Sequence, residues 1–288
     1  MTMPTMLGAV ALGLLLGVPG LARAQYVFTR IDVPEATATY ANGNSTHAIA
    51  GEFDDADGNT HGFVLSRGTF TQFDAPGADG YTSVNGINAK GERSGIYFAN
   101  DRFYGYFWSK GNFTTLDPPG STFSVAEFLN AHGQVVGFSR IDLEPRHGFV
   151  WHKGVFTTVD APGAGPRGTR LYGINDPGQV VGAYADADNT LHGFLLSRDV
   201  YTTLDAPGSD GGFTVAQGIN NRGQIVGLYT DADGTSHGFV LSDGDYTTLD
   251  VPGSFWTEVY SINDKGEIVG AYEDEDGIHG FLGTPAHH

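Results

Sequence analysis

The chain has 288 residues, of which 33 are acidic and 15 are Lys or Arg, giving a net charge of −18 at pH 7, and it has no cysteine. This charge disfavours binding to nucleic acids and to anionic membrane surfaces, because both depend on contacts from Lys and Arg to phosphates. Disulfides are excluded, and a content of 40% hydrophobic and 12% aromatic residues is too rich for a disordered chain.

Residues 1–24 have the features of a secretory signal peptide. The apolar run Leu7–Leu16 has the length of a signal-peptide core, and Ala22–Ala24 forms a small-residue cleavage signature. No Lys or Arg precedes the run, which is atypical, and Pro19-Gly20 interrupts it well short of the ~20 apolar residues of a membrane span. We therefore expect a secreted or periplasmic protein that begins at Gln25 and has no membrane span.

The remaining residues, 25–288, repeat one phrase six times. Each unit has an Asp-x-Pro turn, an Asn that closes a Gly-Ile-Asn phrase, a Gly in a Val-Val-Gly phrase, and a His-Gly-Phe phrase. The Asn anchors are Asn44, Asn88, Asn130, Asn175, Asn220 and Asn263. Successive Asn anchors are 44, 42, 45, 45 and 43 residues apart, a period that suits a unit of four strands.

Each unit contains four short apolar segments separated by turn residues. In the fifth unit they are Val200–Asp205, Phe213–Ile219, Gln224–Asp231 and His237–Ser242. Six such units predict an all-β domain over 25–288, a six-bladed β-propeller, whose radial sheets leave few exposed edges; we expect it to be a monomer. An open β-solenoid is the alternative, although the capping units that it requires are not evident.

The two ends of the repeat array predict how the ring closes. The array begins inside an Asp-x-Pro phrase and ends just after a His-Gly-Phe phrase, so six full phases are present. If the Val-Val-Gly strand is the innermost of each blade, the first two strands of the chain complete the blade that the last two begin.

The repeated phrase resembles that of the extracellular HAF repeat family. That family is named for a His-Ala-Phe phrase followed by Gly-Ile-Asn and Gly-x-Val-Val-Gly phrases; here His192–Phe194, Gly173–Asn175 and Gln179–Gly182 match them, with Gly in place of Ala. The resemblance covers essentially all of residues 25–288. It implies an exported bacterial repeat protein of uncharacterised function, and it supplies no catalytic residues.

A histidine opens five of the six His-Gly-Phe phrases. These histidines are His61, His147, His192, His237 and His279, and Tyr104 takes the position in the second unit. Imidazole is a frequent metal ligand, but a metal ion needs ligands that converge within about 2.0–2.3 Å. Because the ring holds equivalent positions apart, we expect a repeated structural hydrogen bond, with a metal-binding ring as the alternative.

Asp-x-Asp turns form a second recurrent acidic feature. Their carboxylates are Asp55, Asp57, Asp186, Asp188, Asp231, Asp233, Asp274 and Asp276. They resemble the start of a calcium loop, but the later ligands of an EF-hand are missing, and a hairpin turn explains the same residues. We expect turns, and weak calcium binding is the alternative; the sequence suggests no other cofactor.

The other recurrent residues favour structural roles, because a reaction needs unlike groups at one place whereas every blade needs the same turn. Pro fixes φ, and Asp or Asn side chains bond nearby backbone amides. The recurrent tyrosines Tyr97, Tyr184, Tyr229 and Tyr272 are expected to pack between blades, with a ligand cage as the alternative.

Function is better sought where the repeat is broken. Residues 140–170 hold five of the 14 basic residues that remain after residue 24, next to an aromatic pair. The resulting candidate ligand-binding residues are Arg140, Arg146, Trp151, His152, Arg167 and Arg170. Arg with Trp suits an acidic or sugar-like ligand, through bidentate bonds and stacking. Arg102–Trp108 and Ser254–Trp256 also depart from the repeat; drift in a redundant repeat is the alternative explanation for all of these.

No nucleophile elbow, phosphate loop or zinc-protease motif occurs, so the sequence offers no catalytic residues. The sequence therefore favours a secreted, non-enzymatic propeller that binds a glycan or an envelope protein. One alternative is a glycan hydrolase or lyase with unlike residues converging at the mouth of the central channel. Another is a purely structural envelope or matrix protein, which a fully symmetric channel would favour.

Overall fold

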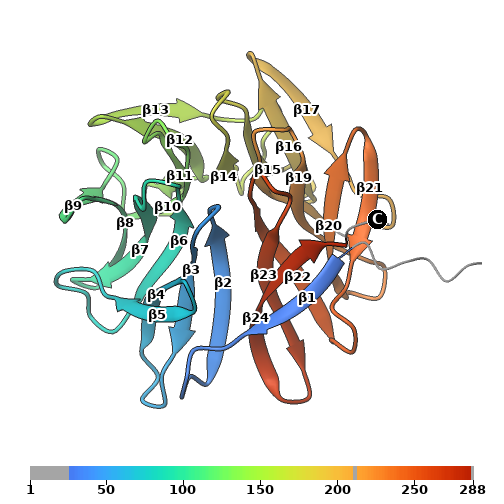
Figure 1. Ribbon diagram of the computed structural model, residues 1–288. Coiled ribbons are helices and arrows are strands. Elements are labelled where there is room, and N and C mark those ends of the chain that lie inside the picture. Colours follow the sequence, from blue (N-terminus) through green and yellow to red (C-terminus); the bar gives the residue numbers. More distant parts are fainter. Residues whose placement is uncertain (1–25, 210–212, 287–288) are drawn as a thin grey trace, which may run out of the picture.

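The computed structural model describes residues 26–209 and 213–286, and the expected signal peptide lies outside them. The described chain forms β-strands only, arranged as a ring of six blades (Figure 1). None of the described residues forms a helix of the length and apolarity that crossing a bilayer requires. The six-bladed β-propeller predicted from the repeat is confirmed, and the open solenoid is wrong.

Each blade has four antiparallel strands, and one parallel bridge between Ala38 and Ile278 joins blades 1 and 6 into a single sheet. Blade 1 consists of β2 (Ala38–Asn44), β3 (Ile49–Asp54), β4 (Thr60–Ser66) and β5 (Thr69–Phe73), and blade 2 of β6 (Thr82–Ile87), β7 (Arg93–Ala99), β8 (Arg102–Ser109) and β9 (Asn112–Leu116). Blade 3 consists of β10 (Phe123–Leu129), β11 (Val135–Arg140), β12 (His147–His152) and β13 (Val155–Val159), and blade 4 of β14 (Thr169–Ile174), β15 (Val180–Ala185), β16 (Leu191–Ser197) and β17 (Val200–Leu204). Blade 5 consists of β18 (Thr214–Ile219), β19 (Ile225–Thr230), β20 (Ser236–Ser242) and β21 (Asp245–Leu249), and blade 6 of β22 (Trp256–Ile262), β23 (Ile268–Asp274), β24 (Gly277–Pro285) and β1 (Tyr26–Ile31).

The first strand of each blade lines the axis of the ring. Strands β2, β6, β10, β14, β18 and β22 each contact the two neighbouring first strands, which closes an inner circle. The Val-Val-Gly strands, such as β19, are second in their blades, so the expectation that they are innermost is wrong. They carry adjacent apolar residues because sheets cover both of their faces, whereas the inner strands β2, β14 and β22 alternate buried and partly exposed side chains.

The ring is closed by one strand, not by the two expected. Strand β1 pairs antiparallel with β24, from Tyr26 opposite Pro285 to Ile31 opposite Gly280. Figure 1 shows this first strand of the chain lying beside the last ones. Because the Gly-Ile-Asn strand is the inner one, blade 6 lacks only its outermost strand, which the N-terminal segment supplies. The sequence repeat is therefore offset from the blade by one strand.

The two glycine-containing phrases pack against each other within a blade. The Phe of the His-Gly-Phe phrase is fully buried, as at Phe239, and its ring lies against the Gly of the Val-Val-Gly phrase. A Cβ on Gly227 would lie 2.0 Å from the carbonyl oxygen of Val215 and 2.9 Å from Cε1 of Phe239, both in the same blade. Only glycine allows this approach, so it is a condition of the packing inside the blade, from which Phe239 joins a core cluster with Leu204 of the preceding blade.

The Asn anchors hold the inner strands together at their C-terminal ends. Asn175 donates from Nδ2 to the backbone carbonyl of Asn220 in the next blade, 3.1 Å away, and its Oδ1 accepts from the backbone amide of Gln179. Equivalent inter-blade bonds link Asn88 to Asn130, Asn130 to Asn175, Asn220 to Asn263 and Asn263 to Ser45. In blade 1 the equivalent residue is therefore Ser45, and the assignment of Asn44 to this position is wrong by one residue.

Candidate functional site

The inner strands all run in the same direction along the axis. We call the face at which they begin the top face and the face at which they end the bottom face. The loops between second and third strands and the loops that enter the inner strands meet on the top face, where Thr60 bridges Tyr81 and Arg146 bridges Gly168. Irregular residues of adjacent blades are thereby brought together on the top face.

The upper part of the channel holds a cavity of about 290 Å³. Every inner strand contains a β-bulge, a register shift that leaves one residue, or two in β10, without a partner on the second strand. The bulge residues lining the cavity are Asn42, Asn85, Glu127, Phe128, Tyr172, Gln217 and Tyr260. One structural device, repeated six times, thus presents chemically unlike side chains to one space.

Two carboxylates lie in this cavity. Burial raises the pKa of Glu127 to about 7, against the effects of a hydrogen bond from Asn85 and of the Arg170 charge. Burial also raises the pKa of Glu52, although Tyr81 donates to its Oε2 at 3.1 Å. At neutral pH Glu127 therefore populates both its protonated and its ionised form, and it can either donate or accept a hydrogen bond.

Blades 3 and 4 form a basic and aromatic rim above the cavity, defined by Arg140, Arg146, Arg167 and Arg170 with Phe123, Phe138 and Tyr172. The guanidinium of Arg140 lies over the Phe123 ring at 5.7 Å, and that of Arg170 over the Phe138 ring at 5.7 Å. Burial and the charges of the other three arginines lower the pKa of Arg146. The structure thus brings together four of the six residues that the sequence singled out as ligand-binding candidates.

Trp151 and His152 are placed apart from that rim. They end strand β12, whereas Arg146 precedes its start. Trp151 is buried, its ring 5.3 Å from that of Phe107, in the core of blades 2 and 3. Because a strand of six residues separates its ends by about 20 Å, Trp151 cannot stack on a ligand held by Arg146.

The opposite side of the top opening is acidic. Burial raises the pKa of Tyr40 on β2, and four surrounding carboxylates raise it further: Asp54, Glu52, Glu273 and Glu258. Tyr260 donates to Glu258 at 2.9 Å, and the indole of Trp256 donates to Glu273 at 2.5 Å. Trp256, which the sequence marked as irregular, therefore belongs to this acidic side.

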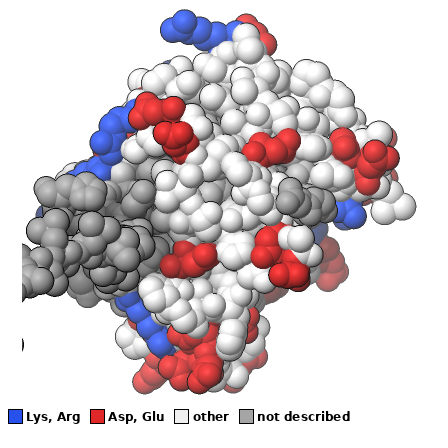
Figure 2. All heavy atoms as spheres, turned by 90° about the vertical axis from the view of Figure 1, so that its right-hand side faces the viewer, with Lys and Arg blue, Asp and Glu red and all other residues white. Residues whose placement is uncertain are grey.

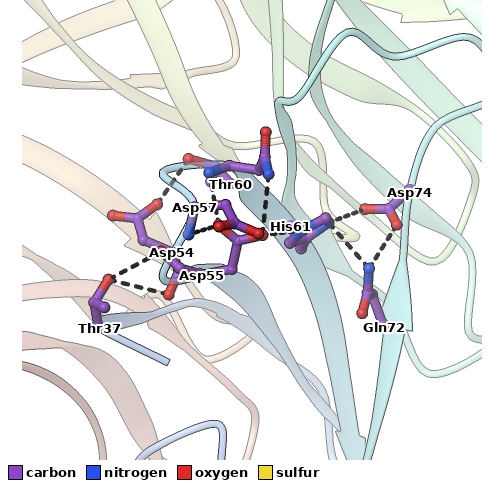
Figure 3. Close-up of polar contacts among 9 residues, drawn as sticks. Thr37, Asp54, Asp55, Asp57, Thr60, His61, Gln72 and Asp74 are labelled. Atoms are coloured by element: carbon purple, nitrogen blue, oxygen red, sulfur yellow. Dashed lines mark hydrogen bonds and ion pairs between the residues drawn. The ribbon is translucent and has the colours of Figure 1, made fainter. Parts of the chain in front are cut away.

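The repeated histidines join two acidic turns within a blade (Figure 3). His61 Nδ1 lies 2.8 Å from Asp74 and its Nε2 lies 3.2 Å from Asp55. Equivalent Asp–His–Asp contacts occur at His192, His237 and His279, whereas His147 contacts Asp160 alone. The histidines thus make the repeated structural hydrogen bond predicted from the sequence. In blade 2, Arg102 pairs with Asp117 in their place.

The Asp-x-Asp turns close on themselves. Oδ1 of Asp55 accepts from the backbone amides of Asp57 and Asn59, at 2.9 and 2.8 Å, and the same pattern recurs at Asp186 and Asp231. The second aspartate of each turn, such as Asp57, is exposed. Within 26–209 and 213–286 no three His, Cys, Asp or Glu side chains are grouped so as to hold a metal ion. The first aspartates thus bind their own turns.

The recurrent tyrosines lie against the residue that opens the His-Gly-Phe phrase of their own blade, which is a histidine for Tyr184, Tyr229 and Tyr272 and Tyr104 for Tyr97. All four also belong to core clusters that include residues of the preceding blade, as expected. Tyr229, for example, stacks on His237 with ring centroids 5.2 Å apart, and its hydroxyl lies 3.0 Å from that of Thr248.

Figure 2 shows the side of the ring that carries β20 and β21, where acidic side chains lie in scattered groups and basic ones are few. The basic residues of the rim are therefore a local departure in an acidic protein.

Sequence reasoning missed the bulge residues. Apart from Phe128, they lie three positions before the Asn anchor or, in blade 1, before Ser45, and the residue there is Asn, Glu, Tyr or Gln, whereas the Gly, Ile and Asn that follow recur in most units. This variation inside a constant phrase was the available signal. What the sequence could not supply was the β-bulge, because it is the bulge that turns these side chains into the channel.

The sequence matches no protein-family model and no curated protein. The fold is similar to solved six-bladed propellers. The fucose-recognising lectin of Aleuria aurantia, described as a six-bladed β-propeller, has a TM-score of 0.54 and 13% identity over 86% of this chain and 93% of the lectin. AofleA from Arthrobotrys oligospora has a TM-score of 0.53 and 11% identity, over 88% of this chain and 85% of that chain. The gluconolactonase XC5397 from Xanthomonas campestris has a TM-score of 0.51 and 11% identity, over 88% of each chain.

Proposed function

We propose that the protein is a non-enzymatic, exported propeller that binds a carbohydrate in the cavity at the top of its channel. The observation that carries this proposal is the set of bulge residues, which line one cavity with four residue types at six equivalent positions where the repeat could have given six identical ones. A structural matrix protein was expected to have a fully symmetric channel, so this asymmetry favours ligand binding over that alternative.

The lining suits a sugar chemically. Sugar hydroxyls both donate and accept hydrogen bonds, and Asn85, Gln217 and Glu127 offer amide and carboxyl partners. The rings of Tyr172 and Phe138 offer apolar faces on which the C–H face of a sugar can pack. A cavity of mixed apolar walls and few convergent polar groups is the usual form of a small-molecule site.

The solved structures of similar fold support a carbohydrate ligand but do not decide between binding and catalysis. One of them is a fucose-recognising lectin and one is a gluconolactonase, so similar folds carry binding and catalysis. The resemblance of the repeat phrase to the HAF repeat proteins agrees with export and with a repeat scaffold. The choice of binding over catalysis rests on the absence of any catalytic motif in the sequence.

Gln217 offers the sharpest test. Its side chain lines the cavity and makes no hydrogen bond to any described residue, so its loss should leave the fold intact. We expect a sugar from a glycan panel to raise the melting temperature, and Gln217→Ala to weaken its binding roughly tenfold by calorimetry. Asn112→Ala, on the outer strand β9, is the matched control. A panel without a single binder, or equal affinities in the two variants, would contradict the proposal.

The second candidate is a glycan hydrolase or lyase, favoured by one observation. Glu52 and Glu127 share the cavity, and a carboxyl whose pKa lies near 7 can act as a general acid. If the protein is an enzyme, incubation with the bound glycan should release products that mass spectrometry detects, and Glu127→Gln should stop that release while leaving binding. If the glycan is unchanged after prolonged incubation, the enzymatic candidate is wrong and only the binding function remains.

A further inference from the structure

Four arginines of the rim lie together although their charges repel. Arg146 forms a backbone bridge with Gly168, and its carbonyl accepts from the amide of Thr169 at 2.9 Å. This contact brings Arg146 next to Arg167 and Arg170, which flank those two residues. Electrostatic repulsion makes such a cluster unfavourable in the absence of negative charge.

No carboxylate of the described residues forms an ion pair with the cluster, although the charge of Arg170 acts on Glu127 below it. The protein has 33 acidic residues, yet within the described ranges its arginine ion pairs are formed by Arg30 and Arg102, outside the rim. The Nε atoms of Arg140 and Arg146 are buried and have no hydrogen-bond partner among the described residues, as is also true of Arg93 and Arg102 outside the rim. A buried donor without a partner is unfavourable, and a ligand oxygen would satisfy it.

The aromatic rings hold two of these guanidinium groups in place. Arg140 and Arg170 lie over Phe123 and Phe138, and Tyr172 accepts from Nη1 of Arg170 at 3.3 Å. A guanidinium packed on a ring keeps its N–H groups at its edge, where they can bind a planar carboxylate in a bidentate manner. The rim therefore presents oriented donors.

The rim belongs to the cavity. Phe138 and Tyr172 line the cavity, and Arg140 and Arg170 lie two residues from them along the same strands, β11 and β14. Residues two apart on a strand point to the same side, so these two arginines stand above the cavity at its top opening. An anionic group bound by them would place the rest of the ligand among the bulge residues.

From these observations we propose that the ligand is an acidic sugar, a uronate, whose carboxylate is bound by Arg140, Arg146 and Arg170 while its hydroxyls contact the bulge residues. This inference rests on the proposed function and narrows it. The acidic side of the opening, which includes Asp54 and Glu273, disfavours the same carboxylate. The opposed charges thereby fix the direction in which the sugar enters.

The experiment compares uronate oligosaccharides with their methyl esters, which are neutral and otherwise alike. The probes are oligomers of galacturonate, glucuronate and mannuronate, with inorganic sulfate as an anion without a sugar. We expect one acid to bind at least tenfold more tightly than its ester, and this preference to shrink as salt rises. Arg146→Gln and Arg170→Gln should each weaken binding of the acid by roughly 10- to 100-fold and leave the ester unchanged.

Arg198→Gln is the matched control, because it removes the same charge from the exposed hairpin between β16 and β17. Unchanged melting temperatures of the ligand-free variants would show that they fold. Equal binding of acid and ester, or binding of neutral sugars alone, would overturn the inference and leave the proposed function standing. Sulfate binding as tight as that of the uronate would overturn the assignment to a sugar. A panel in which nothing binds would overturn both.

Discussion

The two ends of the channel are built from the same inner strands and differ in kind. At the bottom end five blades present the same Asn, which is buried and bonded to backbone groups of its own turn and of the next blade. At the top, the six bulges present side chains of several types, namely Asn, Glu, Phe, Tyr and Gln, to a cavity. A residue that repeats here satisfies the backbone, whereas a residue that varies faces space that a ligand can fill. Repetition therefore marks structure, and its interruption marks the candidate site.

The largest effect is expected where a repeated residue leaves no room. Gly227→Ala would place a methyl group 2.0 Å from a backbone carbonyl and 2.9 Å from the Phe239 ring, so strand β19 must move away from β18. We expect a loss of at least about 4 kcal/mol in the free energy of unfolding, measured with urea. Gly234→Ala, in an open turn with φ +84° and nothing within 4 Å, should lose only about 1 kcal/mol. Similar losses in the two variants would refute the packing role.

The second test removes one link of the bottom ring. Asn175→Ala deletes a donor to Asn220 and an acceptor for Gln179, and it leaves buried backbone groups without partners. We expect the free energy of unfolding to fall by about 3 kcal/mol, while affinity for a ligand of the top cavity is unchanged. Calorimetric titration beside urea unfolding checks both statements. A loss of affinity in a variant that is still folded would break the division between the two ends.

Much of this fold could be predicted because it is repeated. The four anchors, their period and the turn residues were enough to predict the strands and the number of blades, because nearly every unit carries them, whereas the number of strands that close the ring was predicted wrongly. The order of strands within a blade was not predictable, because both Gly-Ile-Asn and Val-Val-Gly segments read as short buried strands. Ser45 shows the same limit: the letters Asn44 fitted the phrase, and only the hydrogen bond from Asn263 identifies the equivalent position.

The candidate site was predictable in part. Four arginines could be found because basic residues are scarce in this chain, so their density between 140 and 170 was informative. Trp151 lay in the same stretch, but proximity in sequence placed it wrongly, since β12 runs from the top face to the bottom. The bulge residues required knowledge of a local register shift, which depends on pairing between strands and not on local composition.

The third test concerns the stability that the protein loses because Glu127 is buried in the top cavity. Glu127 has a pKa of about 7 in the fold and 4.5 as its ordinary value, so the folded state binds more protons between these pH values and stability falls as pH rises. Glu127→Gln should remove this penalty, raising the free energy of unfolding above pH 7 by at most roughly 3 kcal/mol and leaving it unchanged near pH 4. Urea unfolding at pH 4.5 and 7.5 gives both values. A variant less stable than the wild type at pH 7.5 would show that the carboxylate stabilises the fold.

The smallest expected effect tests whether every interruption of the repeat is functional. Glu35 has φ +66° in the position where the other five units have glycine, for example Gly163 with φ +83°. It lies away from the channel, on a groove of about 510 Å³ with Phe53 and Gln72. Because side chains disfavour this backbone region, Glu35→Gly should stabilise the protein by about 0.5–1 kcal/mol, and Gly163→Glu should lose a similar amount. Binding in the channel should be unaffected by Glu35→Gly. If that variant instead abolished sugar binding, the site would lie in the blade 1 groove, and the variation at the bulges would be drift.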